Sequence, residues 1–564
     1  MAAVLVLISA GVMAVLLAAL LAGTLAPWTI GLGWVIGAAA AAAAWRAQRS
    51  EDRWEQPGPL GWFILACAAL FVLRTSFWLA WEQGADLRVG SPKNLGDFAL
   101  HFVHVAFLER APAFWPLNPI AAADPLTYPP GMALWTVMLD RAGFSLFGAF
   151  AFGSLLGLGL GVAACWRWGG AFAVAVLLCN GGLAGWAALQ GGAWIDFQDG
   201  QVWKNIPHAM LTTQRGLLYA LPAGLWLLVR WREVFVRAQG AWGWTDWWLY
   251  CTLPLFHAHT FLALSLLLGV WFLAGLSRRA LLGYVGAAFP VAALLLWQVT
   301  NGFAVGGGLR WDPGWIGEGG SVVKSLIFSY GAWLAVLPAL ALLTGWRWWR
   351  RREPAARETA AFLWPGCGLL GICGLVVFQP WAWDNTKLML WGWLLAAPMV
   401  WQSWLVDVVR AWRAPVLFAL FFSGWVSLIG GLLASREGYG IANRVELSDA
   451  RMAARQLRVD EPVAAAPDYN HVLLLAGQPL VLGYDGHLWS HGIDYRARMG
   501  QLEALMHGGP DWRERADELD VDYLFWGLKE EQRFPGSVKG WSGEAVVHRG
   551  PAGTLYRIRQ DGAP

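Results

Sequence analysis

Long apolar stretches are the feature that most constrains what this chain can fold into. Stretches of roughly 17 or more apolar residues, the length that crosses a bilayer as a helix, recur along most of the 564 residues. Hydrophobic residues make up 57% of the sequence and charged residues only 14%, which excludes an ordinary soluble globular protein. The sequence therefore predicts a polytopic α-helical membrane protein, and its net charge of +3 gives no argument for a nucleic-acid partner.

The apolar pattern predicts about 13 membrane-spanning helices. We place them at residues 3–22, 27–45, 60–82, 146–165, 170–189, 215–231, 245–257, 260–277, 280–299, 323–345, 360–379, 386–405 and 414–434. The first span lacks a charged leader, so we expect it to be retained. The 41 tryptophans are expected to serve mainly as anchors at the membrane interface.

Arginine clusters sort the loops into two sides. They follow the spans on one side only, at residues 46–53, 230–237, 278–279, 347–357 and 410–413. Loops on the cytoplasmic side of membrane proteins carry an excess of lysine and arginine, so this side is predicted to be cytoplasmic, with the N-terminus inside. The composition, rich in alanine, glycine, tryptophan and arginine, is typical of GC-rich bacterial genomes, and we expect a bacterial inner (plasma) membrane protein.

Two regions of the chain are predicted to lie outside the membrane. The transmembrane domain covers residues 1–436 and includes an outer loop, 83–146, in which 129–145 is expected to be a helix on the outer face. Residues 437–564 should form a small periplasmic or extracytoplasmic α/β domain. Its expected elements are strands at 471–477 and 521–527, a helix ending at Gly508, and a closing strand pair at 544–550 and 553–559.

The outer loop carries the first group of candidate site residues. Asp97, His101 and His104 stand at helical positions i, i+4 and i+7, so on a helix they share one face. Tyr128 follows in the same loop, directly before a Pro-Pro pair. Histidines and a carboxylate held between two spans indicate chemistry at the water interface.

Three further outward segments supply cations and donors. The segment 195–216 carries Lys204 and Arg215, and the segment 253–260 holds His257 and His259 where two short helical stretches meet. Short, proline-interrupted spans are typical of cavities, because irregular backbone must line water or protein. The third segment is the aromatic turn 378–387, which ends in Asp384, Asn385 and Lys387.

Group transfer from a phosphate-linked lipid needs a carboxylate base and cations for the departing phosphate. Asp97 is the candidate base, and the candidate phosphate-binding residues are Lys387, Arg215, His257, His259 and Lys204. The candidate pocket residues are His101, His104, Tyr128, Asp384 and Asn385. A divalent metal held by Asp97 and the two loop histidines is an alternative role for that group. Plain structural roles, such as helix-end charges and snorkelling side chains, are the other alternative.

The layout of this loop resembles that of GT-C glycosyltransferases. The matching residues are Asp97 just past a span, then Tyr128-Pro129-Pro130, then Leu146-Phe147-Gly148 opening the next span. The chain looks most like the family 39-type enzymes, the protein O-mannosyltransferases and lipid A aminoarabinose transferases, and its tail is similar to tails on bacterial GT-C-like proteins. The resemblance implies a polyprenyl-phosphate sugar donor and Asp97 as catalytic base. Phe98 follows Asp97 where those enzymes often carry a second acid, which leaves metal dependence and donor identity open.

The expected function is therefore that of an inverting membrane glycosyltransferase. A sugar would move from a polyprenyl-phosphate donor to a hydroxyl of a glycan, lipid or protein acceptor on the periplasmic face. Two other functions stay open at this stage. One is a transporter or flippase of a lipid-linked saccharide, which would also need an outward cavity with cations and aromatic rings. The other is a non-catalytic envelope-assembly protein whose tail recruits partners.

Overall fold

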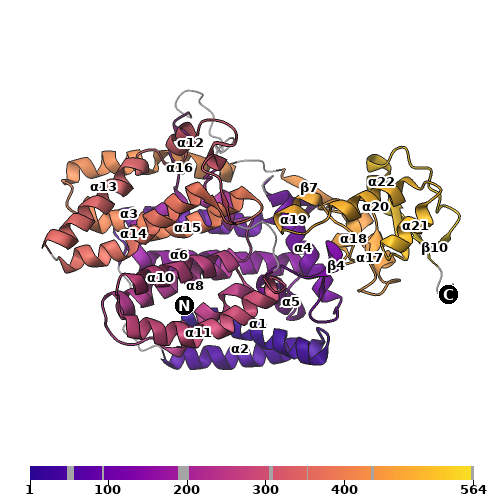
Figure 1. The fold of residues 1–564 in the computed structure, drawn as a ribbon, viewed down its shortest axis with the longest axis horizontal. Helices are drawn as coiled ribbons and strands as arrows, with labels where there is room; N and C mark the ends of the chain where they lie inside the picture. Colours follow the sequence, from indigo (N-terminus) through magenta and orange to yellow (C-terminus); the bar gives the residue numbers. More distant parts are fainter. Residues whose placement is uncertain are drawn as a thin grey trace.

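A helical bundle and a mixed α/β region lie at opposite ends of the molecule's long axis (Figure 1). The computed structural model describes residues 1–47, 56–91, 94–187, 202–303, 309–351, 353–433 and 437–559. The helical elements of the first 433 residues are α1 (Ala2–Ala22), α2 (Pro27–Ala47), α3 (Pro59–Phe77), α4 (Leu95–Glu109), α5 (Gly131–Arg141), α6 (Leu146–Leu178), η2 (Ala184–Ala187), η3 (Pro207–Leu211), α8 (Leu217–Trp231), η4 (Arg232–Val236), α9 (Trp244–Thr252), η5 (Leu253–Leu255), α10 (Ala258–Leu273), α11 (Arg278–Val299), η6 (Trp315–Gly317), α12 (Val322–Tyr330), α13 (Trp333–Trp346), η7 (Arg347–Arg351), α14 (Pro354–Leu375), η8 (Ala382–Asp384), α15 (Asn385–Ala396), η9 (Trp401–Leu405) and α16 (Arg410–Leu433).

The chain is a multi-span helical membrane protein. Within the described ranges, seven helices are long and apolar enough to cross a bilayer: α1, α2, α3, α6, α11, α14 and α16. The pair α12 and α13, bent by 81°, makes eight if it counts as one span. The larger number of crossings expected from the sequence is not established, because α8, α9, α10 and α15 have only 15, 9, 16 and 12 residues. At about 1.5 Å per residue, none of these four alone spans a hydrocarbon core of about 30 Å.

Helix α6 covers the span expected at 146–165 and, after a break, the first part of the span expected at 170–189, ending at Leu178. Its 33 residues leave helical geometry at Gly169 and Gly170, between the stretches predicted at 146–165 and 170–189. Gly170 has a φ of 64°, in the left-handed region that a residue without a Cβ enters at little cost. Ser145 caps the start of the helix by accepting a hydrogen bond from the Gly148 N–H at 3.1 Å.

Many tryptophans hold the bundle together instead of anchoring it in the interface. Eight tryptophans of the first 433 residues are among the most deeply buried side chains, namely Trp135, Trp168, Trp203, Trp231, Trp271, Trp333, Trp391 and Trp393, and Trp541 is buried in the same way in the tail. Several donate the indole N–H to a carbonyl on another helix, as Trp168 does to Leu394 at 2.8 Å and Trp393 to Val176 at 3.0 Å. The interfacial role expected from sequence therefore fits only part of the set, such as the exposed Trp45.

The outer loop folds into two hairpins and two helices. Its strands are β1 (Ala80–Gln83), β2 (Asp86–Val89), β3 (Leu117–Asn118) and β4 (Ala121–Pro125), with α4 and α5 after the first and second hairpin. The span expected at 60–82 ends early because β1 begins at Ala80. A separate short pair joins β5 (Arg310–Trp311) to β6 (Val376–Val377). Helix α5 falls within the outer-face helix expected at 129–145.

The tail is a mixed α/β region, as the sequence predicts. It contains β7 (Tyr439–Asn443), α17 (Arg444–Ala454), β8 (Val463–Ala464), α18 (Val472–Leu475), α19 (Asp485–Ser490), α20 (Arg496–His507), α21 (Trp512–Glu518), β9 (Tyr523–Gly527), α22 (Leu528–Arg533), β10 (Ala545–Gly550) and β11 (Gly553–Arg557). Strands β10, β11, β9 and β8 form one sheet in that order, and the predicted closing pair is the antiparallel pair β10–β11. Helix α20 ends at Gly508 as expected.

The strand expected at 471–477 is wrong, because this stretch forms the short helix α18. His471 caps it: its Nδ1 accepts from the Leu473 N–H at 3.2 Å, while its Nε2 lies 2.9 Å from Glu530 Oε1. A side-chain cap that turns the chain into a helix overrides the β propensity of the apolar run.

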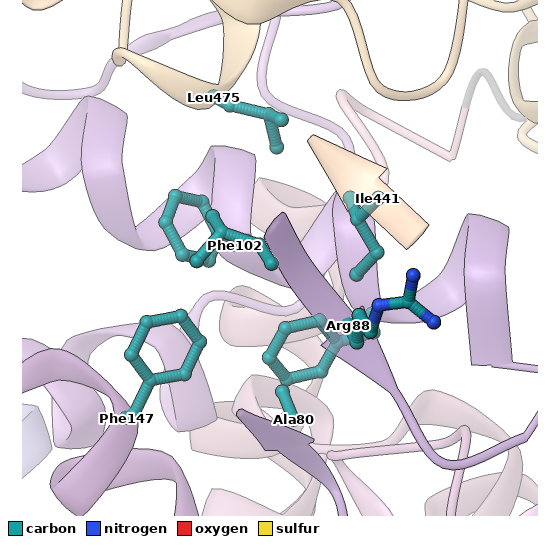
Figure 2. A pocket seen from close by; sticks show the side chains of 8 residues that line it. Ala80, Arg88, Phe102, Phe147, Ile441 and Leu475 are labelled. Carbon is teal, nitrogen blue, oxygen red and sulfur yellow. The ribbon is translucent and has the colours of Figure 1, made fainter. Parts of the chain in front are cut away.

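The tail docks on the outer loop through backbone and side chains. Strand β7 pairs with β2, which extends the first hairpin into a three-stranded sheet. Arg110, at the end of α4, donates to the carbonyls of Ala454 at 2.8 Å and Leu457 at 3.0 Å. Figure 2 shows Phe102 of the loop and Leu475 of the tail lining a small pocket between the two parts. Its volume of 10 Å³ leaves room for about one water molecule.

Candidate functional site

Helix α4 places Asp97 in its first turn, where a carboxylate is favoured by the helix dipole. Asp97 Oδ1 accepts a hydrogen bond from Gln214 Nε2 at 3.2 Å. One turn later, His101 Nε2 lies 3.2 Å from the carbonyl oxygen of Thr213. Both side chains therefore contact the segment just before α8, as the shared helix face predicted from their spacing requires.

Burial dominates the electrostatics of Asp97. It raises the pKa of Asp97 to about 7, while the charge of Lys387 and the Gln214 hydrogen bond pull that pKa down and the Asp384 charge raises it. The carboxyl group is only partly accessible, so it does not point into bulk solvent or lipid. It lines neither the pocket of Figure 2 nor the large cavity described further below. A carboxyl group with this pKa changes charge near neutral pH, as a general base must.

Lys387 is the cation of the site. Its Nζ lies 2.9 Å from Asp384 Oδ1, and both side chains are about nine-tenths buried. The distance is that of an ion pair, although the angle leaves Oδ1 without a directed hydrogen bond. Asp97, Asp384 and Lys387 thus place two carboxyl groups around one ammonium group, on two elements far apart in the sequence.

His257 and His259 lie within electrostatic range of Lys387, at the junction of η5 and α10. Their ring centroids are 5.2 Å apart. His257 caps α10: its Nδ1 accepts from the Thr260 N–H at 3.2 Å and lies 2.8 Å from Thr260 Oγ1. Because Nδ1 is an acceptor, neutral His257 carries its proton on Nε2. That Nε2 is buried and has no protein partner, while His259 Nε2 is bonded to Gln379 Oε1.

A second histidine cluster surrounds Tyr128. Its ring centroid lies 5.9 Å from that of His101, 5.0 Å from His104 and 5.3 Å from His491. His491 follows α19 of the tail, and the ring of His487 stacks on it at 6.4 Å. A histidine of the tail and two histidines of α4 therefore all contact Tyr128.

Burial keeps the histidines of this cluster neutral at physiological pH. It lowers the pKa of His104 to about 3 and that of His487 to about 4. It also lowers the pKa of His101 and His491 well below the ordinary value. His104 Nε2 and His491 Nδ1 are buried without a protein partner, which leaves two polar atoms available to a ligand.

Arg215 contacts helix α6. Its Nη1 bonds Ser154 Oγ, and its Nη2 donates to the Phe150 carbonyl at 3.1 Å, so the guanidinium joins the start of α8 to α6. It also stacks on the Phe150 ring, with Cζ 5.1 Å from the centroid. These contacts give Arg215 a structural role that links two helices, while its Nε is buried without a hydrogen-bond partner among the described residues, so the phosphate contact expected from the sequence stays a prediction.

Asn385 is likewise committed to structure. Its side-chain oxygen accepts from the Phe378 N–H at 3.0 Å, and its Nδ2 donates to the carbonyls of Cys373 at 3.0 Å and Val376 at 2.6 Å. The amide closes the turn that carries Lys387, with both of its N–H groups donated to backbone carbonyls and its oxygen accepting one backbone N–H.

Lys204 is half-buried on a segment beside the same turn, since Trp383 donates to the Val202 carbonyl at 3.1 Å. The first part of the outward segment expected at 195–216, residues 195–201, lies outside the described residues. Among the described residues, no group of three or more His, Cys, Asp or Glu side chains is placed to hold a metal ion.

Four members of this site were not anticipated: Gln214, Gln379, His487 and His491. Gln214 directly precedes Arg215 in an outward segment, so its position was a usable signal. His487 and His491 stand four apart, which places them on one helix face. Nothing in that spacing indicates that the face packs on a loop almost 400 positions earlier; only the tertiary fold brings them to Tyr128.

Comparison with known proteins gives no family. No family model and no curated protein matches the chain. The solved structures that align include the Archaeoglobus fulgidus oligosaccharyltransferase tethered to an acceptor peptide containing the NVT sequon, at 12% identity and a TM-score of 0.38, covering 88% of this chain and 74% of that one. The same enzyme in complex with Zn and sulfate aligns at 13% identity and a TM-score of 0.39, covering 88% and 73%. Similarity at this level assigns neither a family nor a function. Fold and site together define a multi-span helical membrane protein with a polar site between the outer loop and an α/β tail.

Proposed function

We propose that the chain is a membrane glycosyltransferase that transfers a sugar from a polyprenyl-phosphate donor to an acceptor hydroxyl on the outer face, with inversion. The observation that carries the proposal is that Asp97, whose pKa burial raises to about 7, lies within electrostatic range of the buried cation Lys387, which is itself ion-paired with Asp384. One group accepts a proton near neutral pH, and the other stabilises a developing negative charge.

The reaction is a single displacement. Asp97 takes the proton of the acceptor hydroxyl, and the acceptor oxygen forms a bond to the anomeric carbon as the bond to the phosphate oxygen breaks. The electron pair of the broken bond leaves with the polyprenyl phosphate, which departs with a second negative charge. No redox partner is needed, and attack opposite to the leaving group inverts the anomeric centre.

Lys387 and His257 are the proposed phosphate ligands. Lys387 supplies the positive charge. The Nε2–H of His257 supplies a buried donor that no protein group satisfies, which is the kind of group that a ligand completes. The proposal keeps Lys204 beside this turn as a further cation, and it assigns Arg215 to the scaffold.

The tail has a defined place in this proposal. His104 and His491 offer unpartnered ring nitrogens next to Tyr128, and Asp97 is close enough for its charge to raise the pKa of Tyr128. We assign these groups to sugar or acceptor hydroxyls, so that docking of the tail completes the substrate pocket. The acceptor is a glycan, a lipid or a protein hydroxyl, and the membrane supplies the donor.

The proposed orientation follows the arginine distribution: N-terminus in the cytoplasm, Asp97 and the tail outside, in a bacterial inner membrane. The proposal keeps about 13 apolar segments within the membrane, of which short helices such as α8 and α10 are partial spans that end beneath the site.

Transport of a lipid-linked saccharide is less well supported. A flippase needs a polar path between the two faces. Helix α8, which leads from Gln214 toward the other end of the bundle, buries the apolar Leu218, Leu221 and Leu225 instead.

The test is transfer by purified Asp97→Asn in detergent with bacterial lipid extracts as the donor source. The variant should lose about 10²–10⁴-fold in rate, the usual contribution of a general base, and retain polyprenyl-phosphate binding. Asp86→Asn, in the same outer loop and exposed, is the matched control and should keep full activity. Equal transfer by both variants, with wild-type rates, would refute the role of Asp97.

A further inference from the structure

A large cavity lies within the bundle, away from the site just described. Its volume is 960 Å³, at the upper end of the roughly 300–1,000 Å³ typical of small-molecule pockets. Its wall is formed by the first half of α3, the break in α6, the end of α8, residues 398–402 and the first half of α16.

The lengths of two helices give the distance between this cavity and Asp97. Helix α8 begins three positions after Gln214, which contacts Asp97, and leads to Arg232 on the cavity wall. Helix α6 runs from Phe150, whose ring contacts that of Phe98, to Trp168 on the same wall. At about 1.5 Å per residue, each path covers roughly 25 Å, close to the thickness of a bilayer core. The cavity therefore lies toward the opposite face, which the arginine clusters predict to be cytoplasmic.

The cavity opens sideways between α3 and α16. Of the residues on its rim, Leu60 is 56% exposed, and Phe63 and Phe418 are each 53% exposed. Large apolar side chains on the outside of a membrane bundle face hydrocarbon, so the mouth opens to lipid. The deeper wall is aromatic and includes Phe172 and Phe421, whose rings pack edge to face at 5.4 Å.

Both charged side chains on this wall are arginines, Arg167 and Arg232. The Cζ of Arg232 lies 4.2 Å from the ring centroid of Trp168, a stack that fixes the plane of the guanidinium group. The Cζ of Arg167 lies 4.9 Å from the ring centroid of Trp226. A largely apolar chamber with two arginines in its wall, each stacked on an aromatic ring, is complementary to an amphiphile with an anionic head.

The hydrogen-bonding state of Arg232 supports this reading. Its nearest acid is Glu358, at 3.6 Å from Nε, and that carboxylate is held in a two-point pair by Arg237 at 2.8 and 2.9 Å. Among the described residues, Nε of Arg232 has no hydrogen-bond partner, and Nη2 contacts the sulfur of Met399 at 3.8 Å. A guanidinium group this poorly satisfied retains donors for a phosphate.

We propose that this cavity is a binding site for an anionic glycerophospholipid of the cytoplasmic leaflet. Its acyl chains lie against the aromatic wall, and its phosphodiester pairs with Arg232 and Arg167. The site is independent of the proposed transferase activity, because it lies about a bilayer thickness from Asp97 and uses none of the same residues.

Native mass spectrometry of the purified full chain tests the assignment. After delipidation, the protein is offered phosphatidylglycerol and phosphatidylethanolamine with identical chains in equal amounts. The wild type should retain phosphatidylglycerol preferentially, and Arg232→Gln should weaken that binding about tenfold, the effect of one lost charge-assisted contact. Arg279→Gln removes an exposed arginine predicted on the same face and is the matched control, expected to bind as the wild type does.

Ala414→Trp covers the case in which Arg232→Gln does not fold. Ala414 is an exposed residue at the cavity, so a larger side chain there narrows the mouth without disturbing the core. It should reduce retention of both lipids and leave transfer at the Asp97 site unchanged. Equal retention of the two lipids by the wild type, equal loss in Arg279→Gln, or displacement of phosphatidylglycerol by polyprenyl phosphate would each overturn the proposal.

Discussion

Asp97 Oδ1 and Gln214 Nε2 lie 3.2 Å apart, although the two residues are separated by 117 positions in the chain. The hydrogen bond joins the first helix of the outer loop to the segment that opens α8. It partly offsets the effect of burial on the pKa of Asp97. The proposed base is thus positioned by a neutral partner and not by a second acid.

Removal of this partner should shift the pH dependence of transfer. Because the Gln214 N–H favours the ionised carboxylate, Gln214→Leu should raise the pKa of Asp97 further above about 7. The rising limb of kcat/KM should move to higher pH by about half a unit to one unit, as expected for one neutral hydrogen bond. Gln501→Leu, on α20 of the tail, should leave the profile in place. A shift to lower pH would contradict the assignment.

Asp97→Asn should make the protein more stable, and the gain should depend on pH. The pKa of Asp97 is about 7 in the fold against 3.8 for a free side chain, so the fold favours the protonated form. The cost of keeping this carboxyl group grows as pH rises from about 4 and levels off above about 7. The increase in Tm of the variant should therefore be small at pH 4 and largest at pH 8. Equal Tm values at pH 8 would indicate that the carboxyl group is not desolvated.

Gly477→Ala should loosen the docking of the tail on α4. Gly477 has a φ of +80°, and an added Cβ would stand 2.4 Å from the Ala106 carbonyl oxygen. The left-handed backbone alone costs a side chain about 1–2 kcal/mol, and the contact adds to it. We expect faster proteolysis at the start of the tail and lower transfer. Gly500→Ala, where a Cβ meets nothing within 4 Å, is the control and should behave as wild type.

The Arg215→Met variant distinguishes a structural role of Arg215, through its contacts with α6, from the predicted role as a phosphate ligand. Loss of the contacts to Ser154 and Phe150 should lower the stability of the fold by about 2–3 kcal/mol, as for a hydrogen bond to a charged group. The KM for donor should stay within about twofold of wild type, because the guanidinium is turned toward α6. Thermal unfolding and donor titration decide between the two roles. An unchanged Tm with a tenfold higher KM would restore Arg215 to the donor site.

Local pattern was sufficient for much of the architecture. Apolar length and periodicity predicted α1, α2 and α11 almost to the residue. A helix that crosses the membrane needs an apolar stretch as long as the hydrocarbon core, and such a stretch is visible in the sequence. The same reasoning predicted continuous helices where α9 and α15 are short. Hydropathy reports how apolar a segment is, and it does not report where a helix within that segment ends, as α15 does at Ala396.

Part of the candidate site could be predicted, because two of its residues lie close together in one short segment. Asp97 and His101 share a helix face, and i, i+4 spacing is enough to see that. Arg215 and Asn385 look like ligands in the sequence, since charge and amide groups carry no sign of which way they point. Their partners on α6 and at the end of α14 lie on other elements and are invisible to local pattern.

By itself the sequence determined that the chain enters a membrane, that its polar chemistry gathers in the loop after the third span, and that a separate α/β segment follows. These properties depend on the composition and spacing of neighbouring residues. Only the tertiary structure decided that Lys387 stands near Asp97 and that His491 covers Tyr128. Those meetings depend on how helices pack and on which strand extends the first hairpin, and such long-range contacts leave no trace in local periodicity.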